Sequence, residues 1–153
     1  MLLIYFVTIS RGFTVWPFDM KVSPLSWGSS ESCFAYALAY HALGSEQYED
    51  MGVVKIDMCA ATMVANGDLP SNSTTVTVFH QAQVYTGEPL FVPRPGASSE
   101  DDGTILVVSM NVSASTTGET ALLAIDALTM QQVARITAPF PTAFEFHGQY
   151  IPR

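Results

Sequence analysis

The chain of 153 residues is poor in charge, and in basic charge above all. Charged residues make up 13% of it, with 6 Lys and Arg against 14 Asp and Glu, which gives a formal net charge of −8. Because binding to phosphates requires clustered Lys and Arg, this composition excludes a nucleic-acid-binding role. At 48% hydrophobic residues the chain also differs from disordered segments. One globular domain with its own core is therefore expected.

Cysteine is scarce as well. Cys33 and Cys59 are the two cysteines, and neither belongs to a CxxC motif or a Cys/His cluster. We interpret them as reduced, mostly buried thiols of a cytosolic protein, with a disulfide as the alternative. The apolar start "MLLIYFVTIS" is too short to span a membrane and lacks the features of a signal peptide. It is interpreted as a buried strand, or alternatively as a truncated or mis-joined start.

Helical periodicity is missing too, whereas strand patterns are abundant. In "CFAYALAY" the bulky side chains recur at every second position, and later segments are rich in β-branched residues. Polar turns separate these segments, as in antiparallel sandwiches, barrels and propeller blades. We therefore predict an all-β chain without a helix, with strands over residues 33–40, 52–58, 73–79, 88–92, 104–112, 120–127 and 131–138.

Three consecutive acids, Glu100, Asp101 and Asp102, stand with Gly103 directly before the most strand-like segment. Consecutive carboxylates in an extended segment point alternately to opposite sides, whereas a Ca²⁺ loop of the EF-hand type spaces its ligands at alternate positions. We therefore predict a structural turn, in which Asp and Gly supply the turn geometry and side-chain-to-backbone hydrogen bonds. A Ca²⁺ site built from the three acids is the alternative.

Three stretches, "EPLFVPRPGASSEDDGTILVVS", "ALLAIDALTMQQVARI" and "FHGQY", together closely resemble the carboxyl-terminal segment of the carotenoid cleavage oxygenases. This family also includes the retinoid isomerase of the retinal pigment epithelium. Its members carry, in this order, Glu-Pro-x-Phe-Val, Glu-Asp-Asp-Gly before a strand, a Leu-x-x-x-Asp-Ala hairpin with Val-Ala-Arg, and Phe-His-Gly near the end. The resemblance extends over residues 87–153 and more loosely over 33–58, and it does not cover residues 1–30. Ala143 departs from it, since the family usually has proline there.

The resemblance implies a seven-bladed β-propeller of antiparallel strands, of which residues 31–153 form only the last blades and residues 1–30 an uncertain start. It also implies Fe(II) on the propeller axis, held by four histidines. By its place in Phe-His-Gly, His147 takes the role of the last iron ligand. Glu88, in the Glu-Pro motif, takes the role of a carboxylate that accepts the ring N–H of a ligating histidine and so fixes its orientation. Neutral imidazole suits Fe(II), and open coordination positions allow O₂ to bind.

The implied activity is oxidative cleavage of a polyene double bond in a carotenoid or apocarotenoid by O₂. Isomerisation on the same iron centre is an alternative that these residues do not separate from it. Three iron ligands of the family are absent from the sequence, so the isolated chain is expected to be an inactive fragment. The other alternative is a small non-catalytic β protein that binds an apolar ligand or a partner. Peripheral membrane contact is left open, and a cytoplasmic location is the default, with a plastid location if an upstream region is missing.

The remaining histidines and aromatic residues have plainer interpretations. His41 and His80 match no ligand motif of the family, so neither is expected to bind metal. Four aromatic residues could line an apolar tunnel, but aromatic side chains at period two are more often part of a core. We therefore assign to the core Tyr36, Tyr40, Phe91 and Phe146.

Overall fold

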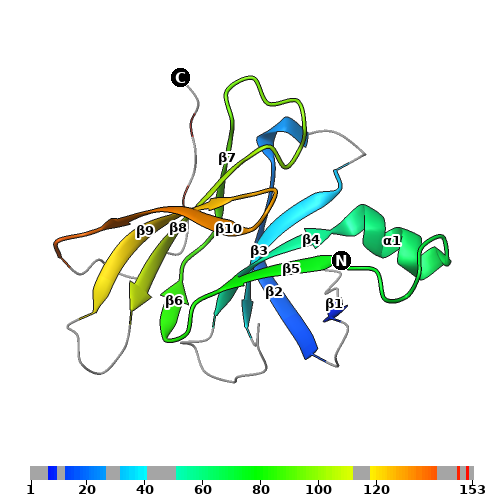
Figure 1. The fold of residues 1–153 in the computed structure, drawn as a ribbon, viewed down its shortest axis with the longest axis horizontal. Helices are drawn as coiled ribbons and strands as arrows, with labels where there is room; N and C mark the ends of the chain where they lie inside the picture. Colours follow the sequence, from blue (N-terminus) through cyan, green and yellow to red (C-terminus); the bar gives the residue numbers. More distant parts are fainter. Residues whose placement is uncertain are drawn as a thin grey trace.

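The fold consists of two antiparallel β-sheets and one helix that extends from the end of a strand (Figure 1). The computed structural model describes residues 7–9, 13–26, 32–40, 51–111, 118–140, 148 and 151. The first sheet has its strands in chain order, and a short 3-10 helix, η1 (Pro24–Ser26), follows its second strand. Its strands are β1 (Val7–Ile9), β2 (Phe13–Val22), β3 (Phe34–Tyr40), β4 (Gly52–Asp57) and β5 (Val76–His80).

The second sheet has the order β10-β9-β8, and two short strands share the other edge of β8. β6 pairs with the end of β8, and β7 pairs with its beginning. The two short strands thus form one interrupted row, joined by residues 87–89. The strands are β6 (Val84–Thr86), β7 (Leu90–Pro93), β8 (Gly103–Asn111), β9 (Glu119–Asp126) and β10 (Gln131–Thr137).

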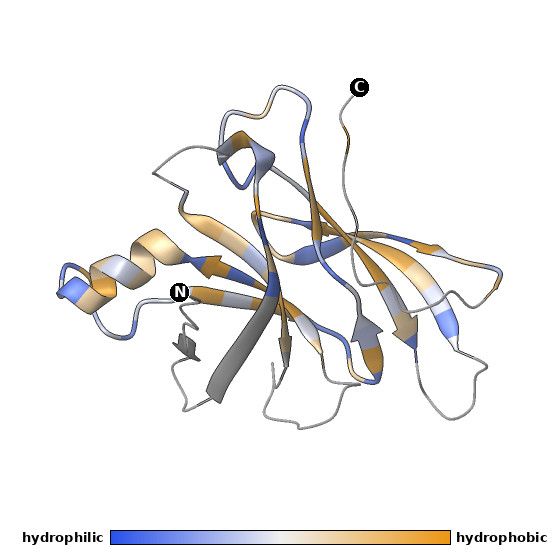
Figure 2. Ribbon diagram, turned by 180° about the vertical axis from the view of Figure 1, so that it is seen from behind, coloured by the Kyte–Doolittle hydropathy of each residue, from blue (hydrophilic) through white to orange (hydrophobic). Residues whose placement is uncertain are grey.

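The core lies where the two sheets meet. Alternate residues of β8 and β9 are buried, as expected for strands that present one face to a core. Their side chains form a cluster with Tyr36, Val53 and Phe79 of the first sheet. Figure 2 shows hydrophobic residues along the strands of both sheets and mainly hydrophilic residues in the loop between β7 and β8.

Each of the seven predicted strands corresponds to a strand of the structure, in the predicted order and with antiparallel pairing, over the described part of residues 33–138. The hairpin predicted around Asp126 is present. In its turn, the side chain of Asp126 accepts hydrogen bonds from the backbone N–H and the hydroxyl of Thr129, each at 2.8 Å. These bonds also hold the pKa of Asp126 below its usual value. Strands β1, β2 and β6 were not among the predicted segments, although a buried strand was expected within residues 1–10.

The prediction of a chain without a helix is wrong, since α1 (Met58–Asn66) follows directly on β4. Asp57 begins the helix, because its carboxylate accepts the N–H of Ala60 at 2.8 Å. Gly67 ends it in the left-handed conformation, with φ 83°. The fold is thus mostly β rather than all-β. Within the described residues no helix has the length and hydrophobicity needed to cross a bilayer.

Candidate functional site

Glu88 brings together three segments that are far apart in the sequence. It lies between β6 and β7, and its side chain is only 6% exposed. One carboxylate oxygen, Oε1, lies 2.7 Å from Nζ of Lys21 at the end of β2. The other, Oε2, accepts the backbone N–H of Gly148 at 2.8 Å. The residue that the family motif singles out is therefore a buried anion anchored to both the first sheet and the carboxyl-terminal segment.

His147, the predicted metal ligand, lies outside the described residues, as do His41, Phe146 and Ala143. The neighbouring Gly148 is described, and the nitrogen that Glu88 contacts is bonded to the carbonyl carbon of His147 in the covalent chain. Two sites predicted 59 positions apart in the sequence are thus connected by one hydrogen bond at the residue next to the histidine.

The other described groups do not assemble into a metal site. His80 lies at the end of β5 and is half-buried. Among the described residues there is no group of three or more His, Cys, Asp or Glu side chains that could hold a metal ion.

Each of the three consecutive acids has its own partner. Glu100 accepts hydrogen bonds from the hydroxyl of Ser32 at 2.8 Å and from the backbone N–H groups of Cys33 at 2.8 Å and Phe34 at 3.0 Å. It thereby binds backbone donors at the start of β3. This is the side-chain-to-backbone bonding predicted for the turn, although it reaches across to the other sheet.

Asp101 and Asp102 point to different cations. Asp101 is 6% exposed, pairs with Nζ of Lys55 at 2.8 Å and accepts the hydroxyl of Ser99 at 2.6 Å. Burial alone would raise the pKa of Asp101, but the bonds from Lys55 and Ser99 outweigh it and hold the pKa below its usual value. Asp102 pairs with the exposed Arg94 at 2.7 Å. The structural interpretation of this turn is confirmed by these contacts.

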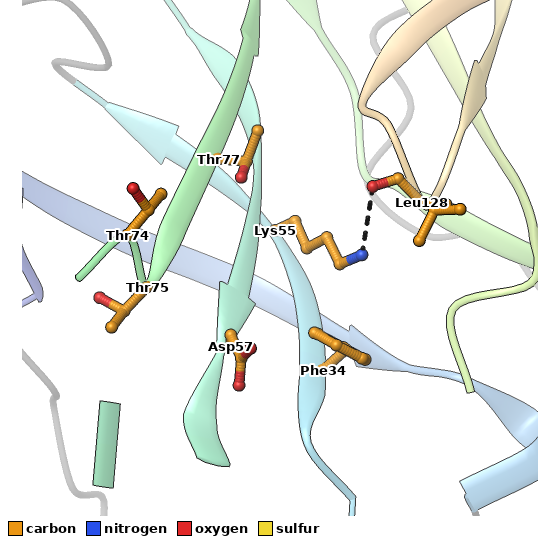
Figure 3. Close-up of a pocket in the computed structure, with 7 residues that line it drawn as sticks. All are labelled: Phe34, Lys55, Asp57, Thr74, Thr75, Thr77 and Leu128. Carbon is orange, nitrogen blue, oxygen red and sulfur yellow. Dashed lines mark hydrogen bonds between the residues drawn. The ribbon is translucent and has the colours of Figure 1, made fainter. Parts of the chain in front are cut away.

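A pocket of about 150 Å³ lies near Lys55, between the first sheet and the turn that joins β9 to β10. In Figure 3 the Lys55 side chain points toward the carbonyl oxygen of Leu128, 3.5 Å from its Nζ, and the three threonines lie on the opposite side of the pocket. Nζ also lies 4.2 Å from the centre of the Phe34 ring. Glu88 is not among the lining residues, so this pocket is separate from the site around Glu88.

The interpretation of the cysteines as reduced thiols is wrong, because Cys33 and Cys59 form a disulfide. Their Cα atoms are 5.0 Å apart. Cys33 directly precedes β3, Cys59 lies in the first turn of α1, and the N–H of Met58 donates to the carbonyl of Cys33 at 2.7 Å. The unpredicted helix is what brings the two sulfur atoms together.

Tyr36 and Phe91 belong to the core, as predicted. They are 0% and 3% exposed, and their rings stack with the centroids 5.3 Å apart. Burial raises the pKa of Tyr36, and the nearby carboxylates of Asp101, Glu100 and Asp126 raise it further. The other two aromatic residues of that prediction, Tyr40 and Phe146, have side chains outside the described set.

Lys21 is the residue of the site that sequence reasoning missed. It lies in residues 1–30, where no family motif was found, and a single lysine in a strand carries no signal of its own. Only the folded arrangement, with β2 beside β7, places its ammonium next to Glu88. Lys55 was missed as well, although it lies within residues 33–58, to which the resemblance loosely extends.

Comparison of the sequence with protein-family models agrees with the fold and the motifs. The model of the retinal pigment epithelial membrane protein family matches residues 27–152. This match covers well over half of the chain, which therefore belongs to that family. The family membership predicted from the sequence motifs is confirmed.

Individual relatives align with about half of the chain. A rice (Oryza sativa subsp. japonica) protein, carotenoid cleavage dioxygenase 8 homolog A, chloroplastic, is 38% identical over 74 residues, which cover 48% of this chain and 13% of the relative. The mitochondrial carotenoid-cleaving dioxygenase of Homo sapiens is 33% identical over 78 residues, which cover 51% of this chain and 13% of the relative. The alignments thus span about one eighth of each relative.

Solved structures show the same fold. A mutant of the Synechocystis apocarotenoid oxygenase matches 87% of this chain and 25% of its own with a TM-score of 0.65 and 23% identity. The cobalt-substituted form of that oxygenase matches 82% of this chain and 23% of its own, with a TM-score of 0.60 and 24% identity. At these identities the likeness is one of fold. The two sheets correspond to part of the oxygenase propeller, which confirms the predicted antiparallel, partial-propeller architecture.

Proposed function

We propose that this chain supplies one iron-ligating histidine, His147, and its supporting carboxylate, Glu88, to a non-haem Fe(II) oxygenase that cleaves carotenoids or apocarotenoids. The observation that carries this proposal is the hydrogen bond from Gly148 to the buried Glu88, in a chain of this family. The relatives named above are carotenoid-cleaving dioxygenases, which favours oxidative cleavage over isomerisation.

Glu88 fits the role of a supporting group. A carboxylate has about four lone-pair positions and so can accept several donors at once, and Glu88 contacts both Lys21 and Gly148. A ligating histidine typically donates its second ring N–H to such a group, which fixes its tautomer and orientation. Burial of Glu88 strengthens this interaction because water does not compete for the carboxylate.

The residues of this chain would orient the ligating histidine and hold it in place, while the metal would supply the redox chemistry. Fe(II), when bound, would activate O₂ beside the polyene double bond. Glu88 accepts the N–H of Gly148, the residue after His147, and the Lys21 ammonium offsets the charge of the buried Glu88 side chain. Because one imidazole does not hold Fe(II) tightly, we expect the chain of 153 residues alone to show no polyene cleavage.

The test is a chimera in which the segment of the rice relative that aligns with this chain is replaced by the corresponding residues of this chain. The chimera is reconstituted with Fe(II) without oxygen, freed of unbound metal, and assayed for iron content and for cleavage of an apocarotenoid. We expect nearly one iron per chain in the chimera, loss of iron in the His147→Ala variant, and roughly 10- to 100-fold weaker iron binding in the Glu88→Gln variant.

The Asp102→Asn variant is the matched control, because Asp102 belongs to an exposed ion pair away from Glu88. It should bind iron like the unmodified chimera. A folded His147→Ala chimera that keeps its full iron content would show that His147 is not a ligand, and the proposal would then be wrong.

A further inference from the structure

We propose that Lys21 is a positioning residue of the Glu88 site: its ammonium fixes the Glu88 carboxylate in the orientation in which that carboxylate accepts the N–H of Gly148, the residue after His147. This inference rests on the proposed function for its catalytic meaning. The dependence of the Glu88–Gly148 hydrogen bond on Lys21 does not require that function.

The two oxygens of Glu88 face different segments of the chain. Oε1 faces Nζ of Lys21 at 2.7 Å, and Oε2 faces the N–H of Gly148 at 2.8 Å. A carboxylate with one anchored oxygen sweeps its other oxygen through an arc, because rotation about its terminal bond is only weakly restricted. Anchoring Oε1 on β2 therefore directs Oε2 toward Gly148.

Burial makes the cation necessary for Glu88. The Glu88 side chain is 6% exposed, whereas that of Lys21 is 37% exposed. A carboxylate removed from water to this degree is costly unless a cation or several donors compensate for the lost hydration. Lys21 can supply this cation at a small desolvation cost, since its ammonium keeps part of its hydration.

A bulge in β2 is what turns Lys21 to this side. Phe18 pairs with Leu38 and Lys21 with Tyr36, so β2 uses three residue steps where β3 uses two. Asp19 has a φ of 50°, which is uncommon for a residue other than glycine. One extra residue in a strand moves the residues after it to the opposite face. The bulge therefore aims Lys21 at Glu88, and an unbulged β2 would aim it away.

The other ion pairs between the described residues differ from this one or belong elsewhere. Arg94 and Asp102 are 61% and 37% exposed, and Arg135 and Glu119 are 31% and 43% exposed, so these pairs lie in water. Lys55 and Asp101 are both buried, but they lie beside the pocket described above. Lys21–Glu88 alone among these pairs joins a buried carboxylate to a backbone group next to the candidate ligand.

The amide of Gly148 gives a direct measurement. We would label the 153-residue chain with ¹⁵N and, without any metal, measure hydrogen-exchange protection and the proton shift of the Gly148 amide. The variants are Lys21→Met, which keeps the alkyl stem, Lys21→Arg, which keeps the cation, and Glu88→Gln. Arg94→Met removes an exposed pair and serves as the control.

We expect Lys21→Met to lower the protection of the Gly148 amide about tenfold or more and to move its proton shift upfield, as Glu88→Gln does. Lys21→Arg should keep both values close to those of the unmodified chain, and Arg94→Met should change neither. Amides in the centre of β8 report global stability, so a purely structural effect would lower protection there and at Gly148 alike.

Unchanged protection of Gly148 in a folded Lys21→Met chain would overturn the proposal. If Lys21→Met does not fold, Lys21→Gln and Lys21→Arg are compared instead, and protection retained by the arginine variant alone supports a role for the charge. Equal protection of the Gly148 amide in Lys21→Gln and Lys21→Arg would overturn the proposal. Because no metal is used, failure here is distinct from failure of the iron test on the chimera.

Discussion

The buried pair of Lys55 and Asp101 joins β4 of the first sheet to the turn before β8 of the second. Nζ of Lys55 lies 2.8 Å from Asp101, and both side chains are 9% exposed. The same ammonium lies over the Phe34 ring at 4.2 Å. Replacing Lys55 by methionine keeps most of the side-chain volume and removes the charge, which leaves Asp101 buried without its cation.

The expected loss of stability is large for a single substitution. Removing one partner of a buried ion pair costs about 3–5 kcal/mol, because the remaining charge is left uncompensated. The hydroxyl of Ser99, at 2.6 Å from Asp101, compensates for only part of this. With a dependence on urea of about 2 kcal/mol per molar, the midpoint of unfolding should fall by about 2 M in the Lys55→Met variant. Circular dichroism in a urea titration measures this midpoint.

The exposed pair of Arg135 and Glu119 provides the control, since their side chains are 31% and 43% exposed. Arg135→Met should cost less than about 1 kcal/mol. The double variant Lys55→Met/Asp101→Asn should be less destabilised than the sum of the two single variants, because neither charge remains. A change of less than about 0.5 kcal/mol in Lys55→Met would refute the reasoning, since the pair would then behave like a surface pair.

The same pair predicts how stability depends on pH. The pKa of Asp101 is lowered in the folded chain, so its contribution to stability is complete above the unfolded pKa of about 3.9. That contribution is lost as the pH falls through the lower, folded value. The difference between the wild-type chain and Lys55→Met should therefore be greatest near neutral pH and shrink in acid, because a protonated Asp101 needs no cation.

Three further substitutions test other parts of the fold by urea unfolding. A Cβ at Gly103 would lie 2.5 Å from the Phe91 ring, so Gly103→Ala should cost about 1–3 kcal/mol, and an unchanged midpoint would contradict this close approach. The hydroxyl of Tyr36 is buried without a hydrogen-bond partner among the described residues, so Tyr36→Phe should be neutral or stabilising by about 1 kcal/mol; a clear loss would reveal a partner. The disulfide of Cys33 and Cys59 closes a loop of 26 residues, so reductant should lower stability by about 3.5 kcal/mol but leave a Cys33→Ser/Cys59→Ser chain unaffected.

The strands were predictable because they depend on local pattern. β8 alternates buried and half-exposed residues along its length, and that period is visible in the sequence. The helix was missed because the apolar residues of "MCAATMVAN" are distributed around the helix and form no distinct apolar stripe. Its signals are the cap residues at its two ends, Asp57 and Gly67, which a search for periodicity passes over.

The candidate site was predictable only where it follows a motif. Glu88 was found from the Glu-Pro motif, and the structure joins it to the residue after His147. Lys21 depends on a bulge in β2 and on the packing of two sheets, neither of which leaves a pattern in the sequence. The disulfide depends on α1, whereas the reduced state was inferred from the lack of a CxxC motif or Cys/His cluster, which does not show which cysteines the fold brings together.

The acidic turn shows why an apparent ligand cluster can be structural. Glu100 accepts backbone N–H groups at the start of β3, and Asp101 pairs with Lys55 of β4, so two successive acids fasten the second sheet to the first. Asp102 turns back to Arg94 within its own sheet. Each carboxylate thus faces a different direction, which a metal site would not allow. Gly103 follows because the chain must pass against the Phe91 ring, where a side chain has no room.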